Sequence, residues 1–205
     1  MDTAFELPPF EGIHEAIADV RAYGIKEGKE KLIALRRNGT RVFEVNGTNQ
    51  RVDGPESYCG KLQDVLLVHC HPGLTTELSD ADFTCIMGYD AWGNLAACCD
   101  DDTISWSQGF KAPRDGFMLE FMILPAVHQL SQEIVSEVAQ REDPTITTDK
   151  AFQQWLNTWK DKNDERYVVL AHKMNAYLAR VGALKDYHVQ LGPKARAILT
   201  RWDAL

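Results

Sequence analysis

The chain has 205 residues, of which 44% are hydrophobic and 25% are charged. This length and composition are typical of a globular protein that can bury a sizeable core. The formal net charge of -8 at pH 7 argues against nonspecific binding to nucleic acids, which are also negatively charged. No apolar run reaches the roughly 18 residues of a membrane span, and the first residues lack a secretory pattern. We therefore expect a cytoplasmic protein without a membrane partner.

Five cysteines occur along the chain, and none of them forms a CxxC pair. In the absence of an export signal, free thiols in a reducing cytoplasm are the simplest interpretation. The only adjacent pair lacks the spacing of a zinc ribbon and has no second pair to complete one. We therefore expect small buried residues without a metal role at all five positions: Cys59, Cys70, Cys85, Cys98 and Cys99.

The first half of the chain alternates between helical and extended patterns. Apolar residues recur at helical spacing over residues 9–23. The pair Asn38-Gly39, placed between two apolar runs, is a strong hairpin signal. Three consecutive aspartates at 100–102 indicate a solvated turn rather than a calcium loop. The expected elements are a helix over 9–23, strands over 31–37, 41–45 and 62–68, a loop over 46–61, a helix over 79–89, and strands over 93–99 and 103–106.

The second half is mainly helical and carries no diagnostic motif. Residues 111–116 are typical of a linker, so the pattern predicts one domain over 1–110 and a mainly helical region over 111–205. The stripe of Phe152, Trp155 and Trp159 is expected to pack in a core rather than to line a binding groove. The expected elements are a helix from about 125 to before Pro144, an amphipathic segment around 152–159, helices over 164–181 and 193–203, and a short strand over 187–191.

His69 and His71, with Asp82 further on, are the most informative feature of the sequence. Two histidines separated by one residue on an extended strand point to the same side, because strand side chains alternate. A carboxylate on a helix that begins just beyond the following loop can return to that side. Two imidazoles and one carboxylate form the ligand set of a catalytic zinc with an open fourth position. The sequence therefore predicts a Zn²⁺ site in a metallohydrolase.

The full pattern, His-x-His-x7-Ser-x2-Asp with Pro72 after the second histidine, resembles the signature of the JAMM (JAB/MPN-type) metallopeptidases. The resemblance covers about residues 9–108 and is closest to bacterial and phage members. It implies an α/β core in which a mixed sheet is flanked by helices, followed here by the helical extension. It also implies that Ser79 donates a hydrogen bond to the oxyanion of the reaction.

The resemblance further requires an upstream glutamate that acts as the general base on the metal-activated water. Glu30 is the best candidate, since it opens an apolar strand and its Lys-Glu-Lys-Leu-Ile segment resembles that of bacterial and phage members. Glu44 is the second candidate, because an acid in the middle of a strand can also face a site. Glu27 is the third. For each of them the alternative is a solvated surface carboxylate.

The resemblance implies a zinc-dependent peptidase or isopeptidase that cleaves an amide bond in a protein, a peptide or a ubiquitin-like conjugate. The chain departs from the RadC form of the family, which has Asn at the position of Cys70 and Ser-Gly at Gly73-Leu74. Two alternatives stay open: a non-catalytic interaction or structural protein on the same scaffold, in a phage or defence-related assembly, and a zinc hydrolase of a non-peptide substrate. The sequence indicates no oligomeric state.

Overall fold

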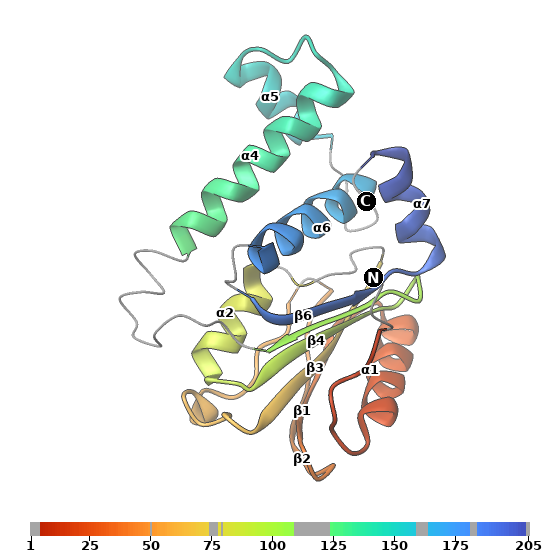
Figure 1. Cartoon of the computed structure of the whole chain (residues 1–205), viewed down its shortest axis with the longest axis vertical. Helices are drawn as coiled ribbons and strands as arrows, with labels where there is room; N and C mark the ends of the chain where they lie inside the picture. Colours follow the sequence, from red (N-terminus) through yellow and green to blue (C-terminus); the bar gives the residue numbers. More distant parts are fainter. Residues whose placement is uncertain are drawn as a thin grey trace.

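The computed structural model describes residues 5–49, 51–73, 78, 80–108, 124–158, 164–180 and 184–203 (Figure 1). The predicted order of helices and strands is present in this part of the chain. The elements are α1 (Ile13–Glu27), β1 (Lys31–Arg36), β2 (Arg41–Asn46), the 3-10 turn η1 (Glu56–Tyr58), β3 (Val65–His71), α2 (Asp80–Tyr89), β4 (Gly93–Cys98), β5 (Ile104–Gln108), α4 (Leu124–Glu142), α5 (Asp149–Leu156), α6 (Glu165–Arg180), β6 (Lys185–Gln190) and α7 (Pro193–Arg201).

The first helix begins and ends later than the sequence pattern predicts. Gly12 precedes it in a left-handed conformation with φ of 69°, so Pro8 and Pro9 lie outside the helix. The helix then continues past the last apolar residue of the pattern. It ends at Gly28, which has φ of 63° and whose N–H donates to the carbonyl of Gly24. A C-terminal glycine in this conformation is a common way to end a helix, because glycine meets no steric penalty there.

The strands form one mixed six-stranded sheet in the order β2-β1-β3-β4-β5-β6. The predicted hairpin at Asn38-Gly39 joins β1 to β2, and the amide N–H of Thr40 donates to Asn38 Oδ1 over 3.1 Å. Among the described strands, β3 and β4 are the one parallel pair, and α2 lies between them in the chain. A parallel pair needs such a crossover, which returns the chain across one face of the sheet. This connection brings the start of α2 back toward the end of β3.

The two faces of β3 are buried by different layers. Leu66, Val68 and Cys70 belong to the core cluster beneath α1, which packs on β1, β3 and β4 (Figure 1). The alternating residues Val65 and Leu67 belong to a separate cluster on the opposite face. Since strand side chains alternate, both histidines of β3 lie on the face away from α1. The seven residues of the strand are all buried, so neither face is open to bulk solvent.

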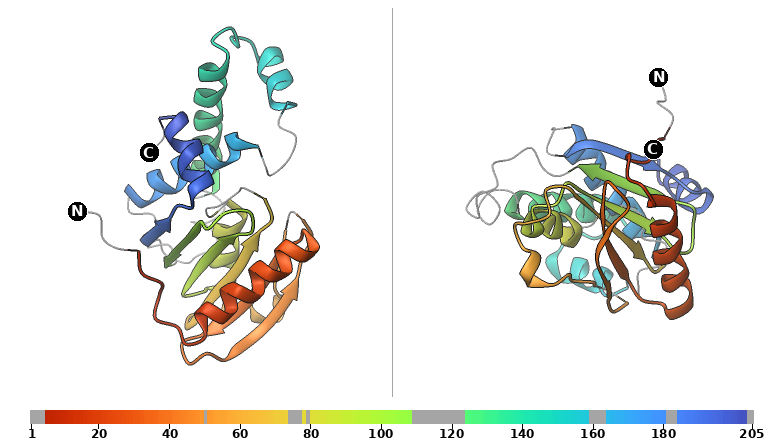
Figure 2. Two further views of the ribbon diagram at one scale, coloured as in Figure 1. Left: turned by 90° about the vertical axis from the view of Figure 1, so that its right-hand side faces the viewer. Right: turned by 90° about the horizontal axis from the view of Figure 1, so that it is seen from below.

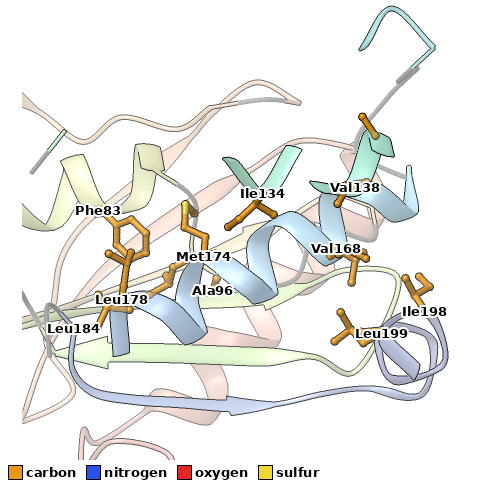
Figure 3. Close-up of a cluster of buried hydrophobic side chains, with 14 of the residues drawn as sticks. Phe83, Ala96, Ile134, Val138, Val168, Met174, Leu178, Leu184, Ile198 and Leu199 are labelled. Atoms are coloured by element: carbon orange, nitrogen blue, oxygen red, sulfur yellow. The ribbon is translucent and has the colours of Figure 1, made fainter. Parts of the chain in front are cut away.

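The C-terminal half takes part in the same sheet and core. Strand β6 pairs with β5 at the edge of the sheet, in register pairs that include Trp106 with His188. Helix α6 lies over the face that carries α2, with α4 and α7 packed against it (Figures 1 and 2). The largest core cluster joins Phe83 of α2 and Ala96 of β4 to apolar side chains of α4, α6 and α7 (Figure 3). Trp155 packs in this cluster and Phe152 packs against it, as the sequence predicts, whereas Trp159 lies outside the described residues.

The aspartate turn at 100–102 is more than the solvated turn that the sequence predicts. Asp101 is buried, with 9% of its surface exposed. Its carboxylate accepts hydrogen bonds from the backbone N–H groups of Lys194 and Ala195, at 3.2 and 3.1 Å, and from the Thr103 hydroxyl at 2.9 Å. It therefore caps the N-terminus of α7, where unpaired N–H groups favour a negative charge. The turn ties the C-terminal helix to the β4–β5 connection.

A methyl group at Gly24 should destabilise the protein, whereas one at Gly88 should stabilise it. An added Cβ at Gly24 would lie 2.3 Å from Cys99 Sγ and 2.9 Å from Cys70 Sγ, both in the layer beneath α1. At Gly88 of α2 it would meet no atom within 4 Å in the described part of the chain outside its own helix. Overpacking costs about 1–3 kcal/mol, and replacing an unhindered helical glycine by alanine gains about 0.5–1 kcal/mol.

Denaturant unfolding of Gly24→Ala and Gly88→Ala beside the wild type measures this difference. We expect a lower free energy of unfolding for the first variant and a higher one for the second. An equal increase in the free energy of unfolding of both variants would show that the side chains of Cys70 and Cys99 move aside without loss of stability.

Candidate metal site

His69, His71 and Asp82 come together at the end of β3 and the first turn of α2. One ligand atom from each lies within 4.8 Å of those of the other two. His69 Nε2 is 2.8 Å from Asp82 Oδ1 and 2.9 Å from His71 Nε2, and His71 Nε2 is 3.4 Å from Asp82 Oδ2. The three side chains are buried, with exposed fractions of 2%, 5% and 9%. The structure thus brings together the three residues that the sequence predicts as metal ligands.

The charge state of His69 and Asp82 is set by their proximity. Burial by itself would lower the pKa of His69, but the Asp82 carboxylate raises this pKa to about 9. Burial would likewise raise the pKa of Asp82, but the charges and hydrogen bonds of His69 and His71 hold it well below 3.8. A buried imidazolium and carboxylate therefore form an ion pair at neutral pH. A metal ion that binds between them has to displace the proton of His69.

Glu30 lies on the same face as the two histidines. It directly precedes β1, whose antiparallel register pairs Leu32 with His69, so continuation of this register places Glu30 opposite His71. Its backbone pairs with the hairpin end, donating to the carbonyl of Thr48 and accepting from the N–H of Gly47, both at 2.8 Å. The side chain is buried, with 6% exposed, and its charge contributes to the raised pKa of His69.

Glu44 lies on the other side of the sheet. It pairs in register with Ile33, whose side chain packs in the cluster beneath α1. Its carboxylate binds Arg41 and Lys31, at 2.8 and 2.9 Å, and Arg41 also binds Asp19 of α1. The histidines occupy the opposite face, so the sheet separates Glu44 from them. Of the three candidate bases, Glu30 is the one that lies buried on the face of the sheet that carries the histidines.

Glu27, the third candidate, is exposed in the last turn of α1, and its Oε1 lies 3.0 Å from Lys26 Nζ. It is therefore a solvated surface carboxylate. Ser79, which the sequence predicts to stabilise the oxyanion, lies outside the described residues. Its neighbour Leu78 is fully buried. The backbone carbonyl of Leu78 accepts a hydrogen bond from Asn175 Nδ2 over 2.7 Å. Helix α6, in the C-terminal half of the chain, thus holds Leu78 in place shortly before α2.

Asn94 is a residue of the site that the sequence interpretation missed. It lies in β4, next to β3, and only 2% of it is exposed. Its Oδ1 is 3.1 Å from His69 Nδ1, and its Nδ2 is 3.4 Å from the backbone carbonyl of Asp82. The signal available in the sequence was an amide inside an otherwise apolar strand, Gly93–Cys98. A polar residue in a fully buried strand usually has a specific hydrogen-bond partner.

The cysteines do not belong to the group of His69, His71 and Asp82. All five are free thiols, but Cys59 is exposed and Cys85 and Cys99 are only partly buried, so the prediction of five buried cysteines is wrong for these three. Cys70, between the two histidines, points to the α1 face as predicted. Cys98 donates a hydrogen bond to the Gly73 carbonyl over 2.9 Å. Burial and the nearby Asp82 charge raise the pKa of Cys85 to about 12, so this thiol stays protonated at neutral pH and is a poor metal ligand.

Comparisons with family models, with curated proteins and with solved structures found no match for this chain. The fold and the site therefore define the protein by their own features. It is an α/β protein with a six-stranded mixed sheet, a helical C-terminal part and a buried His-His-Asp group that can hold a metal ion. Among the helices described, none combines the length and the apolar character needed to cross a membrane.

Proposed function

We propose that this protein is a zinc-dependent hydrolase of the JAMM type that cleaves an amide bond in a protein, a peptide or a ubiquitin-like conjugate. One observation carries the proposal: two histidines and one aspartate converge on one buried point, with Glu30 on the same face. The ordered signature through Ser79 and Asp82 adds the resemblance to metallopeptidases. A structural zinc site normally has four protein ligands, whereas three protein ligands are typical of a catalytic site.

The donor set fits zinc in its chemistry. Imidazole nitrogen and carboxylate oxygen are both common zinc ligands, and the ligand atoms already lie within 4.8 Å of one another. When bound, zinc lowers the pKa of a coordinated water and polarises the scissile carbonyl. His69 and His71 would supply nitrogen ligands and Asp82 an oxygen ligand. The negative charge of Asp82 also offsets part of the cost of a cation in this buried place.

Glu30 is proposed as the general base and then the general acid. A carboxylate on the face of the ligands can take a proton from the attacking water and deliver it to the leaving amine. Ser79 is proposed to donate a hydrogen bond to the oxyanion that develops on the scissile carbonyl, a contribution of about 3–4 kcal/mol in comparable sites. These two roles divide proton transfer and charge stabilisation between separate side chains.

Metal content is the first test of this proposal. We expect elemental analysis to find about one zinc per chain in purified wild type and a large loss in His71→Ala, because a three-ligand site that loses one ligand holds zinc weakly. His14→Ala is the matched control, since His14 is exposed on α1 and faces away from the site. Its zinc content should equal that of the wild type.

A screen of peptides and ubiquitin-like conjugates follows for the zinc-loaded protein. Cleavage by wild type and His14→Ala, but not by His71→Ala, would support an amide hydrolase. A wild type that takes up no zinc even when it is supplied would contradict the proposal and indicate an interaction protein on this scaffold. Zinc uptake with hydrolysis of a non-peptide substrate alone would instead indicate a zinc hydrolase of a non-peptide substrate.

A further inference from the structure

Asn94 connects the two elements that carry the metal ligands. Its side chain extends from β4 between His69 at the end of β3 and the backbone of Asp82 in α2. Both contacts are fully buried, and an amide in such a place is costly unless its hydrogen bonds are made. Asn94 is thus a polar residue in an otherwise apolar strand, and its side chain contacts both the His69 ring and the backbone of Asp82.

In the neutral form of His69, which binds a metal, the orientation of this amide determines which ring nitrogen carries the proton. The backbone carbonyl of Asp82 can only accept a hydrogen bond, so the end of the Asn94 side chain that faces it is the NH₂ group. The other end, which faces His69 Nδ1, is then the carbonyl oxygen and can only accept. Nδ1 must therefore be the donor. In neutral His69 the lone pair is on Nε2, the atom that faces Asp82 and His71.

We propose that Asn94 is a positioning residue that fixes His69 as an Nε2 ligand and holds the first turn of α2 so that Asp82 meets it. This role rests on the metal site of the proposed function. It explains why one amide makes both contacts: the strand ligand and the helix ligand are aligned to each other through a third element. Partners that orient metal-binding histidines in this way commonly change metal affinity when they are replaced.

Zinc affinity of Asn94→Leu, measured by competition with a chelator, tests this role. Leucine has the same branched arrangement of heavy atoms, although it is bulkier, and it neither accepts nor donates a hydrogen bond, so we expect zinc binding to weaken by roughly 10- to 100-fold. Ser107→Ala is the matched control. Ser107 is the register partner of Asn94 on β5, is fully buried and donates to the carbonyls of Gln108 and Lys185. Its replacement should lower stability but leave zinc affinity unchanged.

Asn94→Asp separates positioning from packing. A carboxylate still accepts a hydrogen bond from His69 Nδ1 but cannot donate to the Asp82 carbonyl, so this variant should recover part of the affinity that the leucine variant loses. If Asn94 only filled space, the buried charge of the aspartate variant would lower zinc affinity at least as much as the leucine substitution does. Nuclear magnetic resonance of the zinc-loaded protein gives a further readout: the Nδ1–H proton of His69 should exchange slowly in wild type and Asn94→Asp, and rapidly in Asn94→Leu. Asn94→Ala replaces the leucine variant if that protein does not fold.

The outcomes are distinct. Wild-type zinc affinity in Asn94→Leu, beside loss of zinc in His71→Ala, would overturn the role of Asn94 and leave the metal site intact. Equal weakening in the leucine and aspartate variants would overturn it in favour of packing. A wild type that binds no zinc would overturn both this role and the proposed function. Zinc binding without any peptide cleavage would contradict the proposed activity alone.

Discussion

Glu30→Gln should bind zinc as tightly as the wild type and should lose hydrolytic activity. Glutamine keeps the size and the hydrogen-bonding capacity of the side chain but cannot accept the proton of the attacking water. General base catalysis contributes about 10²- to 10⁴-fold in rate, so kcat should fall by that factor. Zinc content should stay near one per chain, because Glu30 is not part of the converging ligand group. Steady-state kinetics and elemental analysis of the same preparation measure the two effects.

Glu44→Gln is the matched control for that experiment. The substitution is chemically identical, but Glu44 lies on the α1 side of the sheet, paired with Arg41 and Lys31. These pairs are partly exposed, so their loss should cost no more than about 1 kcal/mol of stability. Full activity in Glu30→Gln, or an equal loss of activity in both variants, would remove Glu30 from its proposed role as the base.

Asp82→Asn should weaken zinc binding and change how the metal-free protein responds to pH. The amide is a poorer and uncharged ligand, so zinc retention against a chelator should fall. In the metal-free protein the substitution removes the partner of the His69 imidazolium, whose pKa is raised to about 9 in the wild type. Removing one partner of a buried ion pair can cost about 3–5 kcal/mol, and release of the His69 proton limits this loss.

The sign of the pH dependence follows from the two pKa shifts. The raised pKa of His69 contributes stability that is fully present below its ordinary value of 6.5 and is lost as the pH rises through about 9. The lowered pKa of Asp82 contributes stability that is present above 3.8 and is lost as the pH falls below that value. The difference in Tm between wild type and Asp82→Asn should therefore be largest between pH 3.8 and pH 6.5, where both contributions are present.

Thermal unfolding in the presence of a chelator, from pH 4 to pH 10, measures this difference. It should be widest at about pH 4–6.5 and should narrow as the pH rises through about 9. A difference that is constant across the whole range would show that the two side chains do not form an ion pair in the folded protein. Unchanged zinc affinity in Asp82→Asn would remove this residue from the ligand set.

The site depends on the whole chain rather than on its first half alone. Asn175 of α6 holds the Leu78 carbonyl just before α2, and the core cluster of Figure 3 packs α2 against α6 and α4. Asp101 joins the β4–β5 turn to α7, and β6 extends the sheet. The predicted division between residues 1–110 and 111–205 stays a prediction, but residues from both regions share one core.

Local patterns in the sequence determined several parts of the structure. The alternation of side chains along a strand places His69 and His71 together and turns Cys70 away, whatever the remainder of the fold. The Asn38-Gly39 turn specifies the hairpin of β1 and β2, because these residues accept the backbone angles that a tight turn requires. The helical C-terminal part follows from local periodicity, whereas the α/β core with a mixed sheet was expected from the resemblance to a known family.

Only the tertiary structure decided which residues meet across the fold. The choice between Glu30 and Glu44 depends on the register of β1 with its neighbours, since a change of one residue moves a side chain to the other face. Asn94 and Asp101 appear in the sequence as an isolated amide and as one acid of a polar turn. Apart from Thr103, their side-chain partners named above lie at least 12 residues away in the chain, and distances between such residues are set by sheet pairing and helix packing. Local periodicity contains no information on these distances.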